Sequence, residues 1–196
     1  MRKLMPKFAA ASLAGLAAAL ALTGCSTLSV ETNSQPTPKF VLEDYFQGRT
    51  YAYGLFEGPD TKLQRAFTVV ADGVQSGDTL TLNETFLWSD GERQTRVWTF
   101  KKIGEGRYEG RAGDVDGVAR VTTQGNALRI QYKLILPIGK TKIAVDVDDW
   151  SHQFADGAVI NRADMSKFGL HLGRITLTFI KPGQARPVAE GLVGQR

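Results

Sequence analysis

Few residues in this 196-residue chain could perform chemistry, and they begin with its single cysteine and two histidines. A serine or thiol nucleophile works beside a histidine that a carboxylate orients, and His152 does follow Asp148 and Asp149 closely. The sequence has no Gly-x-Ser-x-Gly turn to present such a serine, and Cys25 lies in a different kind of segment. Hydrogen-bonded or surface histidines are therefore the favoured interpretation of His152 and His171. The sequence indicates no catalytic residue.

Alternating aspartates raise the question of calcium, which prefers several oxygen ligands. They occur at Asp114-x-Asp116-Gly117 and at Asp146-x-Asp148-Asp149. Neither stretch completes an EF-hand pattern, and Asp before Gly is also typical of hairpin turns. Two separated histidines without further cysteines make a poor zinc site. We expect neither a metal nor another cofactor.

Glu84 is the most unusual polar residue, because it shares the apolar face of an alternating segment with Trp88. A buried carboxylate needs a partner. Arg96, in phase with Trp98 on the next alternating segment, is a natural candidate. The pair is either structural or holds the polar group of a ligand. We therefore take Glu84, Trp88, Arg96 and Trp98 as candidate lining residues of a ligand pocket.

The elements that must position these residues are strands. Apolar and polar residues alternate clearly over 80–88, 95–101 and 128–134. Six turn signals interrupt the pattern: Asp72-Gly73, Asp90-Gly91, Gly104-Glu105-Gly106, Asp116-Gly117, Gly125-Asn126 and Asp156-Gly157. About nine or ten strands joined by hairpins predict an antiparallel meander, which avoids exposed edges most simply by closing into a barrel.

The expected fold is thus all-β, a single lipocalin-like or calycin-like antiparallel barrel over 39–181, with a β-sandwich as the alternative. One or two short helices are expected, at 42–46 and at 162–168. A membrane-spanning barrel is disfavoured, because Arg129 and Lys133 lie in mid-strand on the outward face.

The N-terminal segment has the layout of an export signal over 1–24, with a basic start and an apolar stretch of Ala, Leu and Gly. Its end, Leu22-Thr23-Gly24-Cys25, resembles the lipobox of bacterial lipoproteins. That resemblance implies that Cys25 receives diacylglycerol and anchors the chain to a membrane. Ser26 in place of Asp implies sorting to the outer membrane of a Gram-negative cell, facing the periplasm. Residues 25–38 are expected to be anchor and flexible tether, and 182–196 a flexible tail.

The leader also accounts for most of the net charge of +4. Without Arg2, Lys3 and Lys7, 21 basic residues stand against 20 acidic ones. The body therefore gives little electrostatic reason to bind nucleic acid.

Several stretches together resemble the bacterial lipoprotein family called domain of unknown function 3833. They are Phe40 to Gly48, Leu82 to Phe86, Asp90 to Glu92, Arg96 to Trp98, Asp114 to Ala119, Gly125 to Leu128, Asp148 to Trp150 and Asn161 to Gly169. The resemblance implies an exported, anchored protein with a β-rich, lipocalin-like body, and it supplies no known activity.

Three functions remain open. The first is binding of a lipid, fatty acid or other apolar ligand inside the barrel. The second is an envelope structural or protein-interaction role with a solid core, because aromatic residues on the strands can either fill a barrel or surround a cavity. The third, an enzyme acting on lipid, is disfavoured.

Overall fold

The computed structural model describes residues 29–183. The expected signal segment 1–24, the anchor residue Cys25 and the sorting residue Ser26 lie outside the described residues. So does the expected tail from residue 184 onward.

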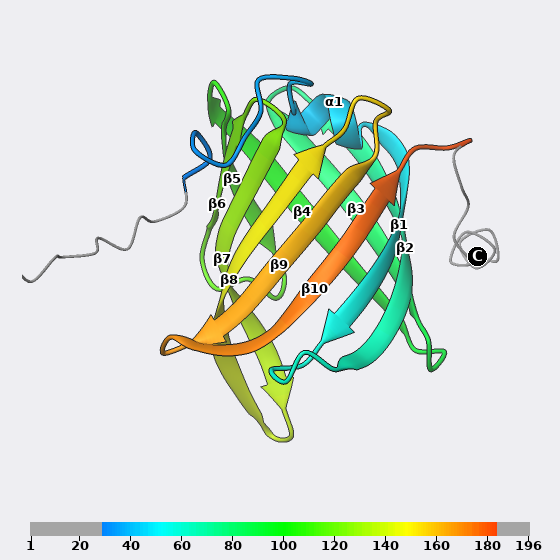
Figure 1. The fold of residues 1–196 in the computed structure, drawn as a ribbon, viewed down its shortest axis with the longest axis vertical. Helices are drawn as coiled ribbons and strands as arrows, with labels where there is room; N and C mark the ends of the chain where they lie inside the picture. The colour runs from blue at the N-terminus through cyan, green and yellow to red at the C-terminus, as the bar shows by residue number, and fades with distance from the viewer. Residues whose placement is uncertain (1–28, 184–196) are drawn as a thin grey trace, which may run out of the picture.

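Ten antiparallel strands form a closed barrel, and each strand pairs with its neighbours along the chain. The meander closes because β1 pairs with β10 as well as with β2 (Figure 1). The predicted barrel is confirmed, and closure excludes the sandwich alternative. The strands are β1 (Gly48–Glu57), β2 (Leu63–Ser76), β3 (Thr79–Trp88), β4 (Arg93–Gly104), β5 (Arg107–Ala112), β6 (Ala119–Gln124), β7 (Ala127–Ile138), β8 (Thr141–Gln153), β9 (Val159–Lys167) and β10 (Leu170–Ile180).

Two local expectations were wrong, and both concern strands. Residues 162–168, expected as a helix, lie largely in β9, where Asn161, Ala163 and Met165 alternate toward the interior. The Asp72-Gly73 signal is not a turn, because β2 continues through it to Ser76. A Cβ on Gly73 would lie 1.8 Å from the carbonyl oxygen of Phe46, so glycine serves there to admit a neighbouring backbone.

That neighbour is the predicted short helix α1 (Leu42–Phe46), which covers one end of the barrel (Figure 1). Its apolar residues Leu42 and Phe46 are buried, and the ring of Phe46 meets that of Phe179 edge to face at 5.5 Å. On its other side, Glu43 accepts hydrogen bonds from the Lys102 ammonium and the Tyr108 hydroxyl. The helix therefore closes this end of the interior. No helix within residues 29–183 is long and apolar enough to cross a membrane.

The described part of the expected tether, residues 29–38, lies against the barrel wall beside β7 and β8. Val30 is buried with Trp150 in a small apolar cluster on the outer face. The backbones of Gln35 and Asn126 are hydrogen-bonded, and the Asn126 side chain accepts from Gln35 N at 2.7 Å. His152 Nε2 lies 2.9 Å from the carbonyl oxygen of Asn33. From Ser29 onward the chain is thus part of the packed body.

Candidate functional site

The barrel interior contains two spaces. A small one of about 110 Å³ lies beneath α1, and Leu42 and Phe46 form part of its wall. A larger one of about 490 Å³ lies toward the opposite end, between residues such as Trp88 and Leu136. The two spaces share six lining residues: Phe67, Phe86, Arg96, Tyr132, Ala163 and Ile175. They therefore meet in the middle of the barrel.

All four candidate lining residues face this interior. Glu84 and Trp98 border the inner space, Trp88 borders the outer one, and Arg96 borders both. Strand pairing places Glu84 directly opposite Arg96, and Leu82 opposite Trp98. The alternation that the sequence indicated is what brings them to the same wall.

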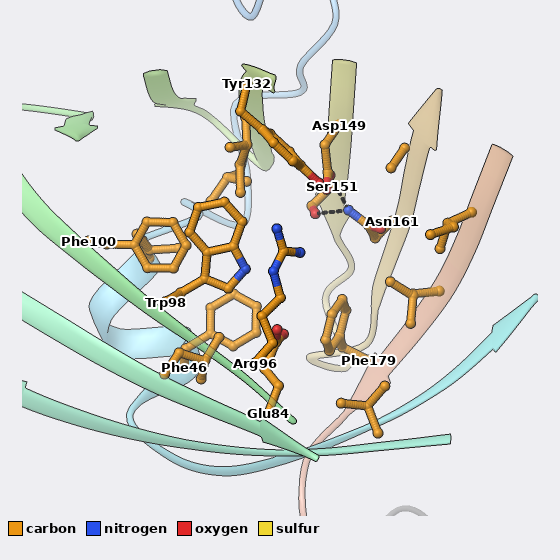
Figure 2. A pocket seen from close by; sticks show the side chains of 18 of the residues that line it. Phe46, Glu84, Arg96, Trp98, Phe100, Tyr132, Asp149, Ser151, Asn161 and Phe179 are labelled. Carbon is orange, nitrogen blue, oxygen red and sulfur yellow. Dashed lines mark hydrogen bonds between the residues drawn. The ribbon is translucent and has the colours of Figure 1, made fainter. Parts of the chain in front are cut away.

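Arg96 points into the interior beside Trp98 (Figure 2), and several contacts hold it there. Its Nε donates a hydrogen bond to Oδ1 of Asp114 at 3.0 Å, and its guanidinium lies 4.4 Å from the centre of the Trp98 ring. Its Nη2 lies 2.9 Å from the same Asp114 oxygen but has no partner in hydrogen-bond geometry. The ring of Tyr132, which meets Trp98 edge to face, has its centre 5.7 Å from the guanidinium carbon. The guanidinium is therefore fixed, and one of its buried nitrogens retains donor capacity.

Glu84 is half-buried, and its side chain borders the cavity. Burial raises the pKa of its carboxyl to about 7, although the charge of Arg96 opposes this shift. The charges of Asp114 and Asp149 add to the rise. Glu84 therefore changes charge close to neutral pH.

A second polar group lies across the cavity on β8 and β9. The Asn161 amide nitrogen donates to both Asp149 and the Ser151 hydroxyl, the latter at 2.9 Å (Figure 2). Burial raises the pKa of Asp149 to about 6, against the lowering effects of the Asn161 hydrogen bond and of Arg96. Asn161 is only 4% exposed, and its Oδ1 has no hydrogen-bond partner. Asn161, on the wall of the cavity, thus carries a buried acceptor without a hydrogen-bond partner.

The sequence did not lead us to place Asp149, Ser151 and Asn161 at the cavity. Asp149 was considered for calcium, and Asn161 entered only within the family resemblance. The signal was present in the alternation itself: Val145 and Val147 precede Asp149 and Ser151 at every second position, so all four share one face.

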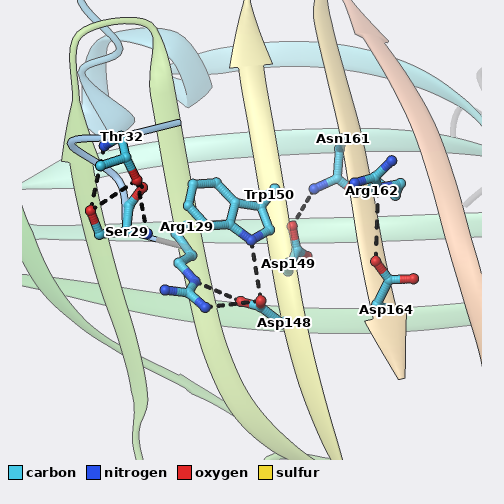
Figure 3. A network of polar contacts seen from close by, with 9 residues as sticks. All are labelled: Ser29, Thr32, Arg129, Asp148, Asp149, Trp150, Asn161, Arg162 and Asp164. Carbon is cyan, nitrogen blue, oxygen red and sulfur yellow. Dashed lines mark hydrogen bonds and ion pairs between the residues drawn. The ribbon is translucent and has the colours of Figure 1, made fainter. Parts of the chain in front are cut away.

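Asp148 and His152 lie on the outer face of β8. Asp148 receives two hydrogen bonds from Arg129 and a third from the indole nitrogen of Trp150 (Figure 3). His152 is on this same outer face, stacked on Trp150 at 6.2 Å, whereas Asp149 faces the cavity. The wall of β8 therefore separates His152 from Asp149, and they form no acid–base pair.

Aromatic residues make up much of the cavity wall. Phe67 lies 5.8 Å from Phe86 and 4.5 Å from Trp88, measured between ring centres. Trp98 stacks on Phe100 at 5.1 Å nearer to α1. An apolar passage with a few converging polar groups is suited to a ligand with an apolar body and one polar end.

Comparisons with known proteins agree with this architecture. The barrel resembles an S-type phycobiliprotein lyase, CPES, from Guillardia theta, with a TM-score of 0.53 and 8% identity over 72% of this chain and 91% of that one. Identity this low makes the likeness one of fold, which is lipocalin-like. No curated protein matches. The model of the family described as "Protein of unknown function (DUF3833)" matches residues 19–181, and the chain belongs to that family.

Proposed function

We propose that the barrel binds one lipid-like molecule with an elongated apolar body and one polar end, and that this polar end lies at the centre of the barrel near Arg96 and Glu84. The observation that carries this proposal is the cavity of about 490 Å³ with aromatic walls, which leads to buried polar groups. Ligand sites have volumes of roughly 300 to 1,000 Å³. A solid-core interaction module, the alternative, has no need of such a space.

The polar groups support binding more than structural stabilisation. Buried polar atoms in proteins are nearly always hydrogen-bonded, and each one that lacks a partner costs about 1 to 3 kcal/mol. Within the described residues, Oδ1 of Asn161 and Nη2 of Arg96 are two such atoms at one cavity. A bound polar group would supply the missing partners.

We also propose that diacylglycerol on Cys25 anchors the protein to the outer membrane, facing the periplasm. Three residues lie between Cys25 and Ser29, so the four Cα–Cα steps that join them span at most about 14 Å. Ser29 and Val30 precede the segment packed near the α1 end of the barrel. The anchor would then lie at the closed end, and the larger cavity would open away from that membrane.

Filling the cavity tests the binding proposal. Ala163 borders both spaces and is 5% exposed, so Ala163→Phe places a ring where the ligand would lie. Arg162→Phe, on the outer face of the same strand, is the matched control. The neutral dye N-phenyl-naphthylamine should bind the unmodified chain and the control with enhanced fluorescence, and should bind Ala163→Phe about tenfold more weakly. Equal binding to a folded Ala163→Phe chain would reject the cavity as the site.

A further inference from the structure

We propose, building on the ligand-binding function above, that the polar end of the ligand is a neutral or cationic hydrogen-bond donor, such as a hydroxyl, amide or amine. It would bind among Asp149, Asn161 and Glu84. An anionic end group, such as an ionised carboxylate or a phosphate, is the one that this site is built to reject.

The first argument is the sign of the charges that face the cavity. Arg96 is the cationic side chain on the wall of the inner space, and Glu84 and Asp149 border that space with it. Asp114 borders the outer space and is already paired with Arg96. Tyr132 is the remaining titratable residue on these walls, and burial raises its pKa, so it is neutral. Carboxyl groups outnumber the guanidinium three to one.

The second argument is the balance of hydrogen-bond donors and acceptors. A side-chain amide has two N–H donors, and Asn161 directs its nitrogen to two partners, Asp149 and Ser151. Its buried oxygen is left without a donor. The Glu84 carboxyl borders the same space. In the inner space an incoming group therefore meets the Glu84 and Asp149 carboxyls and the Asn161 oxygen as acceptors, against one unpaired donor at Nη2 of Arg96, and must supply donors of its own.

The third argument concerns Arg96, the residue that would attract an anion. Its guanidinium is bonded to Asp114 and lies against the face of Trp98. An anionic group would have to share the guanidinium with Asp114 while lying near Glu84 and Asp149. Repulsion between like charges that lie close together in a desolvated site is strongly unfavourable. Burial and the charges of neighbouring carboxylates, which raise the pKa values of Glu84 and Asp149 despite the opposing charge of Arg96, would disfavour a bound anion in the same way.

A series of ligands with one chain length tests this inference. Dodecylamine, dodecanol and dodecanoate differ only in the end group, and each would compete with N-phenyl-naphthylamine for the full-length chain, kept soluble by an amphipathic polymer without free detergent. Near pH 8, where Glu84 and Asp149 are ionised, dodecylamine should displace the dye at about tenfold lower concentration than dodecanoate. Dodecanol should fall between them.

Variants show whether the cavity carboxyls cause the preference. Glu84→Gln combined with Asp149→Asn should reduce the ratio between amine and carboxylate to about threefold or less. The control is Asp146→Asn, which removes a carboxylate of the same strand on the outer face, where it pairs with Lys133 at 2.6 Å. This control should keep the full ratio. Asp149→Asn alone should give an intermediate ratio and serves if the double variant does not fold.

The outcomes separate the two proposals. Tighter binding of dodecanoate than of dodecylamine would overturn the inference about the end group and leave the ligand-binding function standing. A preference for amine that survives in the double variant would also overturn it. If neither the dye nor any of the three compounds binds, the ligand-binding function itself fails, and the inference fails with it.

Discussion

Glu84 and Arg96 occupy directly opposed positions on β3 and β4, yet the guanidinium donates its Nε hydrogen bond to Asp114 and not to Glu84. The strand register that brings the two residues together therefore does not make them a closed ion pair. Glu84 borders the cavity with a carboxyl whose pKa is about 7. This arrangement links the stability of the barrel, its pH dependence and its choice of ligand.

The stability of the barrel should depend on the ionisation of Glu84. Its pKa is raised from 4.5 to about 7 in the folded chain, so the folded state binds more protons than the unfolded state between these values. The contribution of Glu84 to the free energy of unfolding is therefore greatest below about pH 4.5 and falls as the pH rises toward 7. Glu84→Gln should remove this slope and stabilise the fold near pH 8 by on the order of 2 kcal/mol relative to the unmodified chain.

Urea unfolding at several pH values measures this effect. The free energy of unfolding is compared between the unmodified chain and Glu84→Gln at low and at high pH. Because both chains share every other titratable group, the contributions of those groups cancel in the difference. A difference between the two chains that stays constant with pH would contradict the assignment of a raised pKa to Glu84.

Asp114 should stabilise the fold more than an exposed acidic residue does, because it is the hydrogen-bonded partner of Arg96, whose side chain is 17% exposed. Asp114→Asn should lower the free energy of unfolding by about 1 to 3 kcal/mol. Asp146→Asn, which breaks an ion pair exposed by more than half on both sides, should cost less than about 1 kcal/mol. Equal losses in the two variants would show that Asp114 makes no special contribution.

Gly73 should be required for α1 to pack against the end of the barrel. A methyl group at this position would meet the backbone oxygen of Phe46, which cannot rotate away as a side chain can. Gly73→Ala should therefore cost about 2 kcal/mol or more of stability and speed hydrogen exchange at the amides of α1. Gly113→Ala is the control, because nothing lies within 4 Å of the added carbon. Native-like exchange in α1 of the Gly73 variant would rule out this role.

Membrane anchoring should depend on Cys25, and its destination on Ser26. Cys25→Ser removes the thiol to which diacylglycerol would be attached, so we expect the chain to lose its diacylglycerol mass by mass spectrometry of the intact protein. Ser26→Asp should retain that mass and move the chain to the inner-membrane fraction. Unchanged fractionation of Ser26→Asp would remove the basis for the outer-membrane assignment.

Much of the fold followed from the sequence because strand alternation is a local signal. The two-residue period around Glu84 and Arg96 predicts that both side chains face the interior, and this prediction does not depend on which strands pair. The helix at 42–46 was also predicted with its observed bounds. The same local evidence failed at Asp72-Gly73, where glycine serves a contact with Phe46, a residue on a different element. Such contacts depend on tertiary structure and leave no local pattern.

The candidate site was predicted only on the β3 and β4 side. Asp149 and Asn161 reach the cavity from β8 and β9, and closure of the whole barrel is what brings them opposite Arg96. Whether Arg96 donates its hydrogen bond to Glu84 or to Asp114 likewise depends on side-chain geometry, which the alternation of residues does not determine.

The most direct test of the central claim uses the positions of two tryptophans. Trp88 borders the larger cavity, whereas Trp150 is 6% exposed on the outer wall beneath the N-terminal segment. Chains that keep one of these tryptophans, with the other two changed to Phe, would be titrated with a dodecanol that carries bromine at its far end, because bromine quenches indole fluorescence on contact. We predict saturable quenching of Trp88 and none of Trp150. Absence of quenching at Trp88, or equal quenching at both positions, would contradict a ligand site inside the barrel.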